Sequence, residues 1–190
     1  MKVVLATSNP GKVAEAREIL HGSPLEIVTI AMWLGDVETG VTYLENARLK
    51  ARSASRVTHL PVLAEDAGIE VDALHGAPGP HSARFSGPAA TDTTNNAKLL
   101  RLLDGAADRG ARYRAVAVLV LPSGKEFVGE GTFEGAVAER VRGSGGFGYD
   151  PLFVPNGEVR TAAELAPDEK NAISHRGLAL RALVAEFADL

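Results

Sequence analysis

The stretch KVVLATSNPGK, Lys2–Lys12, dominates the interpretation of this chain. Its apolar run Val3–Ala6 is typical of a strand. A helical pattern follows, with Val13, Ala16 and Leu20 on one face. The polar turn between them brings backbone N–H groups, short hydroxyl and amide side chains and a lysine to a helix N-terminus, which favours an anion. The stretch predicts a strand, a turn and a helix, with a phosphate group as the simplest ligand of the turn.

Two other interpretations of this turn exist. Asn9 and Pro10 also form an ordinary helix N-cap followed by proline in the first helical turn. A Walker A loop would require glycine at Ala6 and serine or threonine at Val13, which this chain lacks. The sequence therefore argues against a P-loop kinase or GTPase, and it leaves the capped turn and the phosphate site as alternatives.

The composition narrows the class of protein. A chain of 190 residues predicts one domain over residues 1–190, with room for two lobes. The absence of cysteine excludes a disulfide scaffold, a thiolate nucleophile and a Cys-ligated zinc site, and it fits a cytoplasmic enzyme. A net charge of −4 argues against nucleic-acid and membrane partners. The N-terminus enters a strand directly, so we expect no signal peptide.

The next segments alternate between strand and helix patterns. Residues 25–30 are expected to form a strand, and residues 35–40 a polar turn that contains Glu38. A helix is predicted from about Thr42 to Ser55, and Thr42 and Glu45 have the spacing of a capping box. Lys50 lies off the apolar stripe of this helix, so its default interpretation is a solvated lysine.

Two adjacent carboxylates follow the short apolar strand predicted at residues 61–64. Glu65 and Asp66 stand where this strand is expected to give way to a glycine turn at Gly68. Ligands of open α/β sheets bind beyond the carboxyl ends of strands, and Mg²⁺ prefers hard oxygen ligands of this kind. An aspartate that caps a turn is the alternative interpretation.

The second half of the chain predicts a mixed sheet and two glycine-rich loops. The first loop covers residues 76–88, and a helix is expected at residues 93–103. A buried strand at residues 112–121 turns into a second strand near residues 126–133, which indicates a hairpin. The second loop, residues 143–151, places Phe147 or Tyr149 where either could stack on a flat ligand. Its aromatic rings could equally cover the core.

The last helix is expected to begin within residues 168–177 and to continue through an apolar face. Lys170, His175 and Arg176 would bring three donors to the start of that helix. Such donors could bind a phosphate group or pair with the acceptor edge of a base. Each of them alone would more often have a structural role.

Five segments together resemble one family. They are TSNPGK (7–12), ENARLKA (45–51), LAEDAG (63–68), GGFGYDP (145–151) and EKNAISHRG (169–177). This combination is similar to the inosine triphosphate pyrophosphatase family, also called the HAM1 or RdgB type. The similarity extends from residue 2 to about residue 185, with the segments in the order of the family. GGFGYDP and the SHR segment are highly specific, whereas TSNPGK alone would be weak.

The resemblance implies both a fold and an activity. The implied fold is an α/β, two-lobed ITPase-like fold with a long mixed twisted β-sheet flanked by helices and an active site in the cleft between the lobes. The implied activity is Mg²⁺-dependent hydrolysis of dITP, ITP and XTP to the monophosphate and pyrophosphate, which cleanses the nucleotide pool. The family is usually homodimeric. A pyrophosphatase for modified pyrimidine triphosphates and a nucleotide-binding sensor without turnover remain alternatives.

The resemblance also implies roles for individual residues. Asp66 matches the proton acceptor and metal ligand, and Glu38 matches the other metal carboxylate, with Glu45 and Glu65 as alternatives for that position. Residues 7–12 and two lysines would bind the triphosphate, residues 147–150 would hold the base, and the last donors would contact its oxygen-bearing edge. The implied substrate-binding residues are Thr7, Ser8, Asn9, Pro10, Gly11, Lys12, Lys50, Ala67, Phe147, Gly148, Tyr149, Asp150, Lys170, His175 and Arg176.

One position departs from the family pattern. Many bacterial relatives have D-D-S-G where this chain has Glu65-Asp66-Ala67-Gly68. Ala67 keeps its backbone N–H but has no hydroxyl, so a substrate contact made by that hydroxyl in relatives is not expected here.

Overall fold

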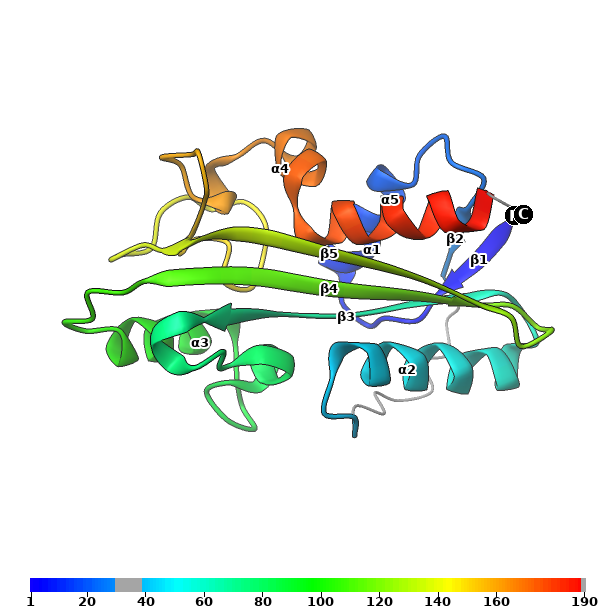
Figure 1. The fold of residues 1–190 in the computed structure, drawn as a ribbon, viewed down its shortest axis with the longest axis horizontal. Helices are drawn as coiled ribbons and strands as arrows, with labels where there is room; N and C mark the ends of the chain where they lie inside the picture. Colours follow the sequence, from blue (N-terminus) through cyan, green and yellow to red (C-terminus); the bar gives the residue numbers. More distant parts are fainter. Residues whose placement is uncertain (30–38, 189–190) are drawn as a thin grey trace. The chain divides into compact units, whose positions relative to one another are not determined.

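The computed structural model describes residues 1–29 and 39–188, and among these six strands form one sheet in the order β2-β1-β3-β4-β5-β6 (Figure 1). β1 pairs in parallel with both β2 and β3, whereas β5 pairs antiparallel with β6. The sheet is therefore mixed, which confirms the prediction. The strands are β1 (Lys2–Leu5), β2 (Glu26–Val28), β3 (Val62–Val71), β4 (Gly110–Val120), β5 (Glu126–Val137) and β6 (Phe153–Pro155).

Helices separate most of these strands. The α-helices are α1 (Pro10–Ile19), α2 (Tyr43–Thr58), α3 (Asp92–Leu102), α4 (Pro167–Ile173) and α5 (His175–Ala188). In the part of the chain that the structure describes, three short 3₁₀ helices accompany them, η1 (Asp72–Leu74), η2 (Gly79–Arg84) and η3 (Ala162–Glu164). Within the described ranges, no helix has both the length and the apolar character needed to span a membrane.

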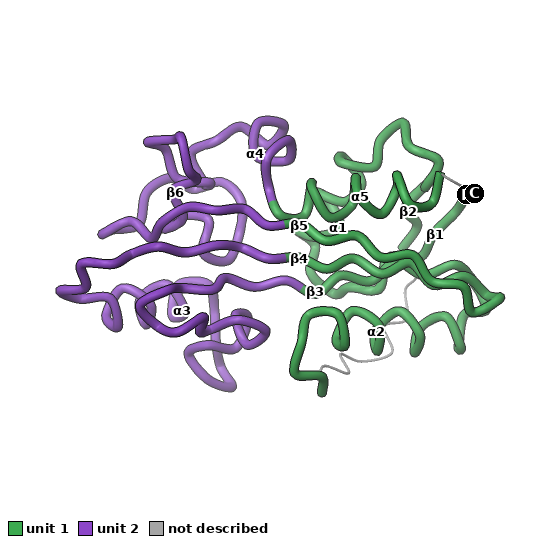
Figure 2. Tube along the Cα trace, in the orientation of Figure 1, with its two compact units in different colours: residues 1–66, 115–131, 175–190 green, residues 67–114, 132–174 purple. Residues whose placement is uncertain are grey.

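The chain divides into two compact units (Figure 2). Unit 1 comprises residues 1–66, 115–131 and 175–190, and unit 2 comprises residues 67–114 and 132–174. β3, β4 and β5 each contribute residues to both units. Each unit has a buried apolar cluster of its own. The prediction of a single domain over residues 1–190 stays a prediction.

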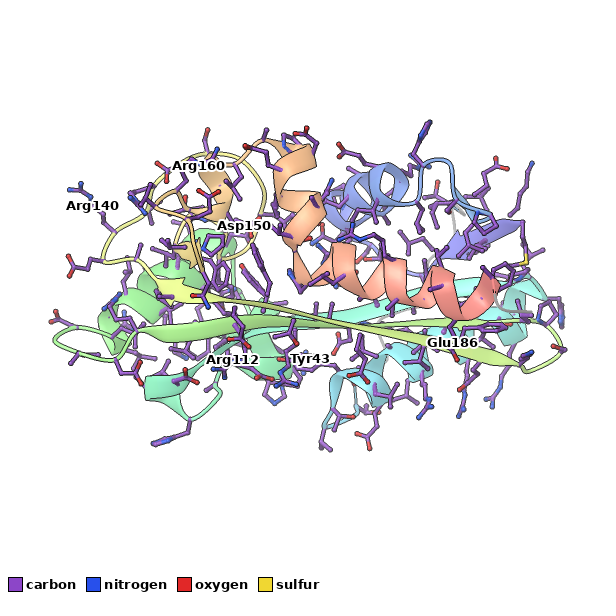
Figure 3. The ribbon with its side chains drawn as sticks, turned by 45° about the horizontal axis from the view of Figure 1, so that its top comes forward. Tyr43, Arg112, Arg140, Asp150, Arg160 and Glu186 are labelled. Atoms are coloured by element: carbon purple, nitrogen blue, oxygen red, sulfur yellow. The ribbon has the colours of Figure 1, made fainter. Side chains whose placement is uncertain are left out.

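Unit 1 has helices on both faces of its part of the sheet. α2 packs Ala47, Ala51 and Ala54 into the valine-rich core of the sheet, while α1 and α5 lie on the opposite face (Figure 1). Gly129 and Gly131 of β5 allow α5 to approach closely, because an added Cβ would lie 2.1 Å and 2.0 Å from carbonyl oxygens of α5. The carboxylate of Glu186, labelled in Figure 3, accepts the Val128 N–H at 2.7 Å.

Unit 2 is centred on aromatic side chains. The rings of Tyr113 and Phe153 meet edge to face with centroids 4.9 Å apart, and Phe133 lies 5.0 Å from Phe153. Leu99 and Leu103 from α3 and its C-cap join the same cluster. These contacts position α3 and the loop that precedes β6.

Several elements differ from the sequence-based predictions. β2 is shorter than expected, and Ile30, the predicted end of that strand, lies outside the described residues. The loop at residues 76–88 contains η2, and β5 continues to Val137. The predicted last helix is two helices, because Ser174 has an extended backbone with ψ of 155° and separates α4 from α5.

Candidate active site

The turn after β1 is a capped helix N-terminus. The side chain of Asn9 accepts the N–H groups of Gly11 and Lys12 at 2.8 Å and 3.3 Å, and Thr7 Oγ1 accepts the Asn9 N–H at 3.2 Å. Pro10 occupies the first helical turn without an N–H. The expectation of free backbone donors at this turn is therefore wrong for Asn9, Gly11 and Lys12, since side chains of the turn itself satisfy them. The N-cap interpretation is confirmed.

Asp66 lies inside β3, and not in a turn after a strand as predicted. Its Oδ1 is 3.0 Å from Lys50 Nζ, and its Oδ2 accepts a hydrogen bond from Asn46 Nδ2 at 3.1 Å. Both donors come from α2 and are four residues apart, so they lie one above the other on the same helix face. Lys50 is thus a buried partner of Asp66, which corrects the interpretation of a solvated lysine.

Glu65, the neighbour of Asp66, forms a bidentate pair with Arg176 at the start of α5. Arg176 Nε lies 2.6 Å from Oε2 of Glu65, and Nη2 lies 2.8 Å from Oε1. Arg176 Nη1 also pairs with Glu15 of α1. Lys12 Nζ approaches Glu65 at 3.8 Å. Unit 1 therefore contains a network of buried and half-buried charges at the beginning of both α1 and α5.

The charges of this network shift one another's pKa values. Burial alone would raise the pKa of Glu65, but the charges of Arg176 and Lys12 and the hydrogen bonds from Arg176 outweigh burial and lower it to about 2. Burial lowers the pKa of Lys12, and the negative charge of Glu65 partly opposes this. Glu65 is therefore an anion at neutral pH.

The predicted metal ligands are Asp66 and one further carboxylate, Glu38, Glu45 or Glu65. Glu38 lies outside the described residues. Glu45 Oε2 accepts the N–H groups of Val41 and Thr42 in the predicted capping box, and both Glu65 oxygens face Arg176. Across residues 1–29 and 39–188, no group of three or more His, Asp or Glu side chains is arranged to hold a metal ion. Of Glu45, Glu65 and Asp66, Asp66 is the one whose carboxylate neither caps a helix nor forms a bidentate pair with an arginine, so it is the best suited of these three to bind Mg²⁺ together with water and phosphate ligands.

The second glycine-rich loop is organised around Asp150, which is labelled in Figure 3. Asp150 Oδ2 accepts the Phe147 N–H at 3.0 Å and pairs with Lys170, and Oδ1 accepts a hydrogen bond from Tyr113 Oη at 3.4 Å. The ammonium group of Lys170 lies 5.3 Å from the centre of the Phe147 ring. All of these residues belong to unit 2.

The two aromatic side chains of this loop differ in accessibility. Tyr149 is buried, and its hydroxyl donates to the Ser82 carbonyl at 2.8 Å. Burial raises the pKa of Tyr149 above its ordinary value. Phe147 is half-buried. Phe147 is therefore the better placed of the two to stack on a ligand.

The remaining predicted residues fall on both units. Lys170 belongs to unit 2, as does the half-buried Ala67 of β3. The buried His175 and Arg176 belong to unit 1. The expectation that Lys170, His175 and Arg176 share one helix start is therefore wrong, because Lys170 lies on α4 and the other two begin α5.

Sequence reasoning missed two residues of the unit 1 network. Asn46 is a fully buried polar residue that precedes Lys50 by one helical turn, and that spacing could have identified it. Glu15 follows Lys12 at helical spacing, but nothing in the sequence indicates its partner, Arg176, at the far end of the chain. With Asp66 and the lysines, this network combines an oriented carboxylate with cations suited to a polyphosphate ester.

The comparisons agree with the predicted resemblance. The model described as the Ham1 family matches residues 3–186. The dITP/XTP pyrophosphatase of Methylococcus capsulatus is 47% identical over 195 residues, covering 100% of this chain and 97% of the relative. The protein of the same name from Symbiobacterium thermophilum is 52% identical over 181 residues, covering 94% and 91%.

Solved structures share the fold. The structure of a HAM1 protein from Coxiella burnetii matches with a TM-score of 0.88 and 41% identity, over 100% of both chains. The Staphylococcus aureus Ham1 protein matches with a TM-score of 0.88 and 35% identity, over 100% of this chain and 99% of that chain. The predicted α/β fold with a mixed sheet flanked by helices is confirmed.

Proposed function

This chain belongs to the Ham1 family, and on that premise we propose that it is a pyrophosphatase that hydrolyses non-standard purine nucleoside triphosphates, dITP and XTP among them. The products are the nucleoside monophosphate and pyrophosphate. The observation that carries the proposal is the match over essentially the whole chain to relatives named dITP/XTP pyrophosphatase. The carboxylate of Asp66, which donors from α2 orient, also supports the proposed hydrolysis, because it can act on a water molecule.

The bond between the α and β phosphates is broken by water. Asp66 is the proposed group that orients or deprotonates this water, because donors from α2 hold each of its oxygens in a defined direction. Lys12 and Lys50 would neutralise the negative charge that moves onto pyrophosphate. No covalent intermediate is needed, in keeping with a chain that has no cysteine.

Mg²⁺ dependence is a further part of the proposal. When bound, Mg²⁺ would neutralise phosphate charge and lower the pKa of a coordinated water. Asp66 fits as a ligand, since a carboxylate is the hard oxygen donor that Mg²⁺ prefers and donors from α2 orient both of its oxygens. Glu45 and Glu65 fit less well, because the first caps α2 and the second is held by Arg176. Glu38 is therefore the favoured second ligand.

The base would be selected by its oxygen at position 6. Hypoxanthine and xanthine carry a carbonyl there, whereas adenine carries an amino donor, so a pocket of donors would leave adenine's amino group unpaired. Lys170, His175 and Arg176 are the proposed donors, with Phe147 stacking on the ring. Lys170 and Arg176 already donate to carboxylates, so their contact with the base rests on the family resemblance.

The same resemblance supports two proposals about the protein's setting. We propose a cytoplasmic enzyme, since a cleansing activity acts on the free nucleotide pool and the chain carries no cysteine. We also propose a homodimer, the usual state of the family. Light scattering during size-exclusion chromatography measures the mass directly, and a mass near 19.9 kDa would be that of the monomer and would refute the dimer.

Product analysis by ion-exchange chromatography tests the activity. The protein is incubated separately with dITP, XTP, dGTP, ATP and a modified dUTP, with Mg²⁺ and with chelator. Monophosphate plus pyrophosphate from dITP and XTP, with little from ATP, is the expected result. Release of single phosphates would identify a phosphatase. Preference for the modified pyrimidine would change the proposed substrate class from purine to modified pyrimidine triphosphates. Binding of dITP without product would identify a sensor.

A further inference from the structure

Side chains of α3 hold both main-chain groups of Gly148. The Gly148 N–H donates to Asp92 Oδ2 at 2.7 Å, and its carbonyl accepts a hydrogen bond from Asn96 Nδ2 at 2.9 Å. Asp92 and Asn96 are four residues apart, so they lie on one face of the helix, one turn from each other. α3 therefore holds Gly148 by two hydrogen bonds, which we call the α3 clamp.

The clamp completes the fixation of a short segment. Gly148 itself has φ of +64°, a backbone conformation that favours glycine. On one side of it, the Phe147 N–H is held by Asp150 at 3.0 Å, and on the other side the Tyr149 hydroxyl is held by the Ser82 carbonyl. The half-buried Phe147 thus belongs to a segment whose backbone is hydrogen-bonded at Phe147 and at Gly148, and whose Tyr149 side chain is held as well.

The burial of Asn96 indicates why an amide stands there. The residue is 6% exposed, and its Oδ1 is buried without a hydrogen-bond partner in the described structure. An unpaired buried acceptor destabilises a fold, so a leucine of similar size would be the more stable choice if packing were the only requirement. The amide instead supplies the donor to Gly148.

We propose that Asp92 and Asn96 are positioning residues for purine binding, which act by holding the backbone of residues 147–150 so that the Phe147 ring is ordered before the base arrives. This inference rests on the proposed function, in which Phe147 stacks on the base. Binding to a loop that is already ordered avoids the conformational cost of ordering it. Without the clamp, the loop has to be ordered when the base binds, so the affinity for the base falls. Contacts with the phosphates are unaffected.

The test compares Asn96→Leu and Asp92→Ala with the matched control Asp104→Ala, an exposed aspartate just after α3. Each clamp variant is expected to raise KM for dITP about tenfold, the effect of one lost hydrogen bond, with kcat nearly unchanged. Inhibition by pyrophosphate, which lacks a base, is expected to stay at the wild-type level. Asn96→Leu is also expected to melt no lower than the control, a result that a purely structural asparagine would not give.

Two results would overturn the inference. One is an unchanged KM for dITP in both clamp variants, and the other is a weakening of pyrophosphate inhibition in parallel with KM, which would indicate general damage to the site. If the wild-type protein does not hydrolyse dITP, the proposed function fails by itself. The same variants are then compared by calorimetric binding of dITP, and equal or absent binding in wild type and variants overturns the clamp proposal as well.

Discussion

Lys50 and Asp66 form an ion pair within unit 1, with Nζ and Oδ1 3.0 Å apart and side chains that are 4% and 6% exposed. Two charges buried this deeply depend on each other, because removing one leaves the other without compensation in a medium of low polarity. Asn46 contributes a further hydrogen bond to the same carboxylate. The pair therefore links the stability of the fold to the group that we assign to catalysis.

Lys50→Met is expected to lower the free energy of unfolding by about 3–5 kcal/mol, since it removes the positive charge that faces the buried Asp66 carboxylate. Arg52→Met is the matched control on the same helix. Arg52 pairs with Glu126 at 2.5 Å but is 52% exposed, so its loss is expected to cost less than about 1 kcal/mol. Urea denaturation of the two variants measures both values. Equal losses would show that Lys50 does not act as a buried partner.

Asp66→Asn is expected to lower kcat for dITP by about 10²–10⁴-fold, because an amide cannot accept the proton of the attacking water. The substitution keeps the size of the side chain, and circular dichroism is used to check that the variant is folded at the assay temperature. Steady-state kinetics with dITP provides the measurement. A folded variant that retains near-normal kcat would refute the assignment of Asp66.

The pH dependence of stability should report the pairing of Glu65 with Arg176. The pKa of Glu65 is about 2 in the folded protein, against an ordinary value of 4.5, so the unfolded chain binds more protons between these values. The stabilisation is therefore complete above about pH 5 and is lost as the pH falls toward 2. Glu65→Gln removes this contribution, and a shallower decline of its unfolding free energy with acid is expected. Identical acid slopes in variant and wild type would contradict the assigned pKa.

Mg²⁺ titrations of activity can distinguish Glu38, the favoured second metal ligand, from Glu45. Glu38→Gln is expected to raise the Mg²⁺ concentration at half-maximal activity by about tenfold or more, since a carboxylate ligand is lost. Glu45→Gln should leave that concentration unchanged, because glutamine also serves at this position of a capping box. Activity without any divalent cation, measured in chelator, would refute the metal proposal itself.

Local patterns predicted most elements of the fold but not the path of β3. The helix caps at Asn9 and Thr42 and the mixed sheet followed from residue spacing and turn chemistry. Glu65 and Asp66 indicated a turn, because adjacent carboxylates seldom lie within a buried strand. Their partners come from α2 and from the start of α5, and this compensation at long range is invisible in a local window of sequence.

The predicted end of β5 was too early for a similar reason. The sequence predicts a strand near residues 126–133, across Gly129 and Gly131, whereas β5 continues past Gly135 to Val137. At each of the three positions a Cβ would come within 2.3 Å of a backbone oxygen of a neighbouring segment. Glycine is needed at these positions because other segments pack closely against the strand, and a local stretch of sequence does not show which segments these are. The sequence pattern predicts a single helix across Ser174, because no glycine or proline stands between the two helices.

The cap at Asn9 limits the affinity that an anion can gain from the backbone of this turn. Two N–H groups of α1 already have an acceptor in Asn9 Oδ1, so a phosphate oxygen that took its place would exchange one hydrogen bond for another. The net gain would be limited to the difference between a charged and a neutral acceptor. An inhibitor that leaves the Asn9 cap intact and binds mainly through Lys12 would therefore lose little affinity. Its phosphate mimic would not need to accept hydrogen bonds from the N-terminus of α1.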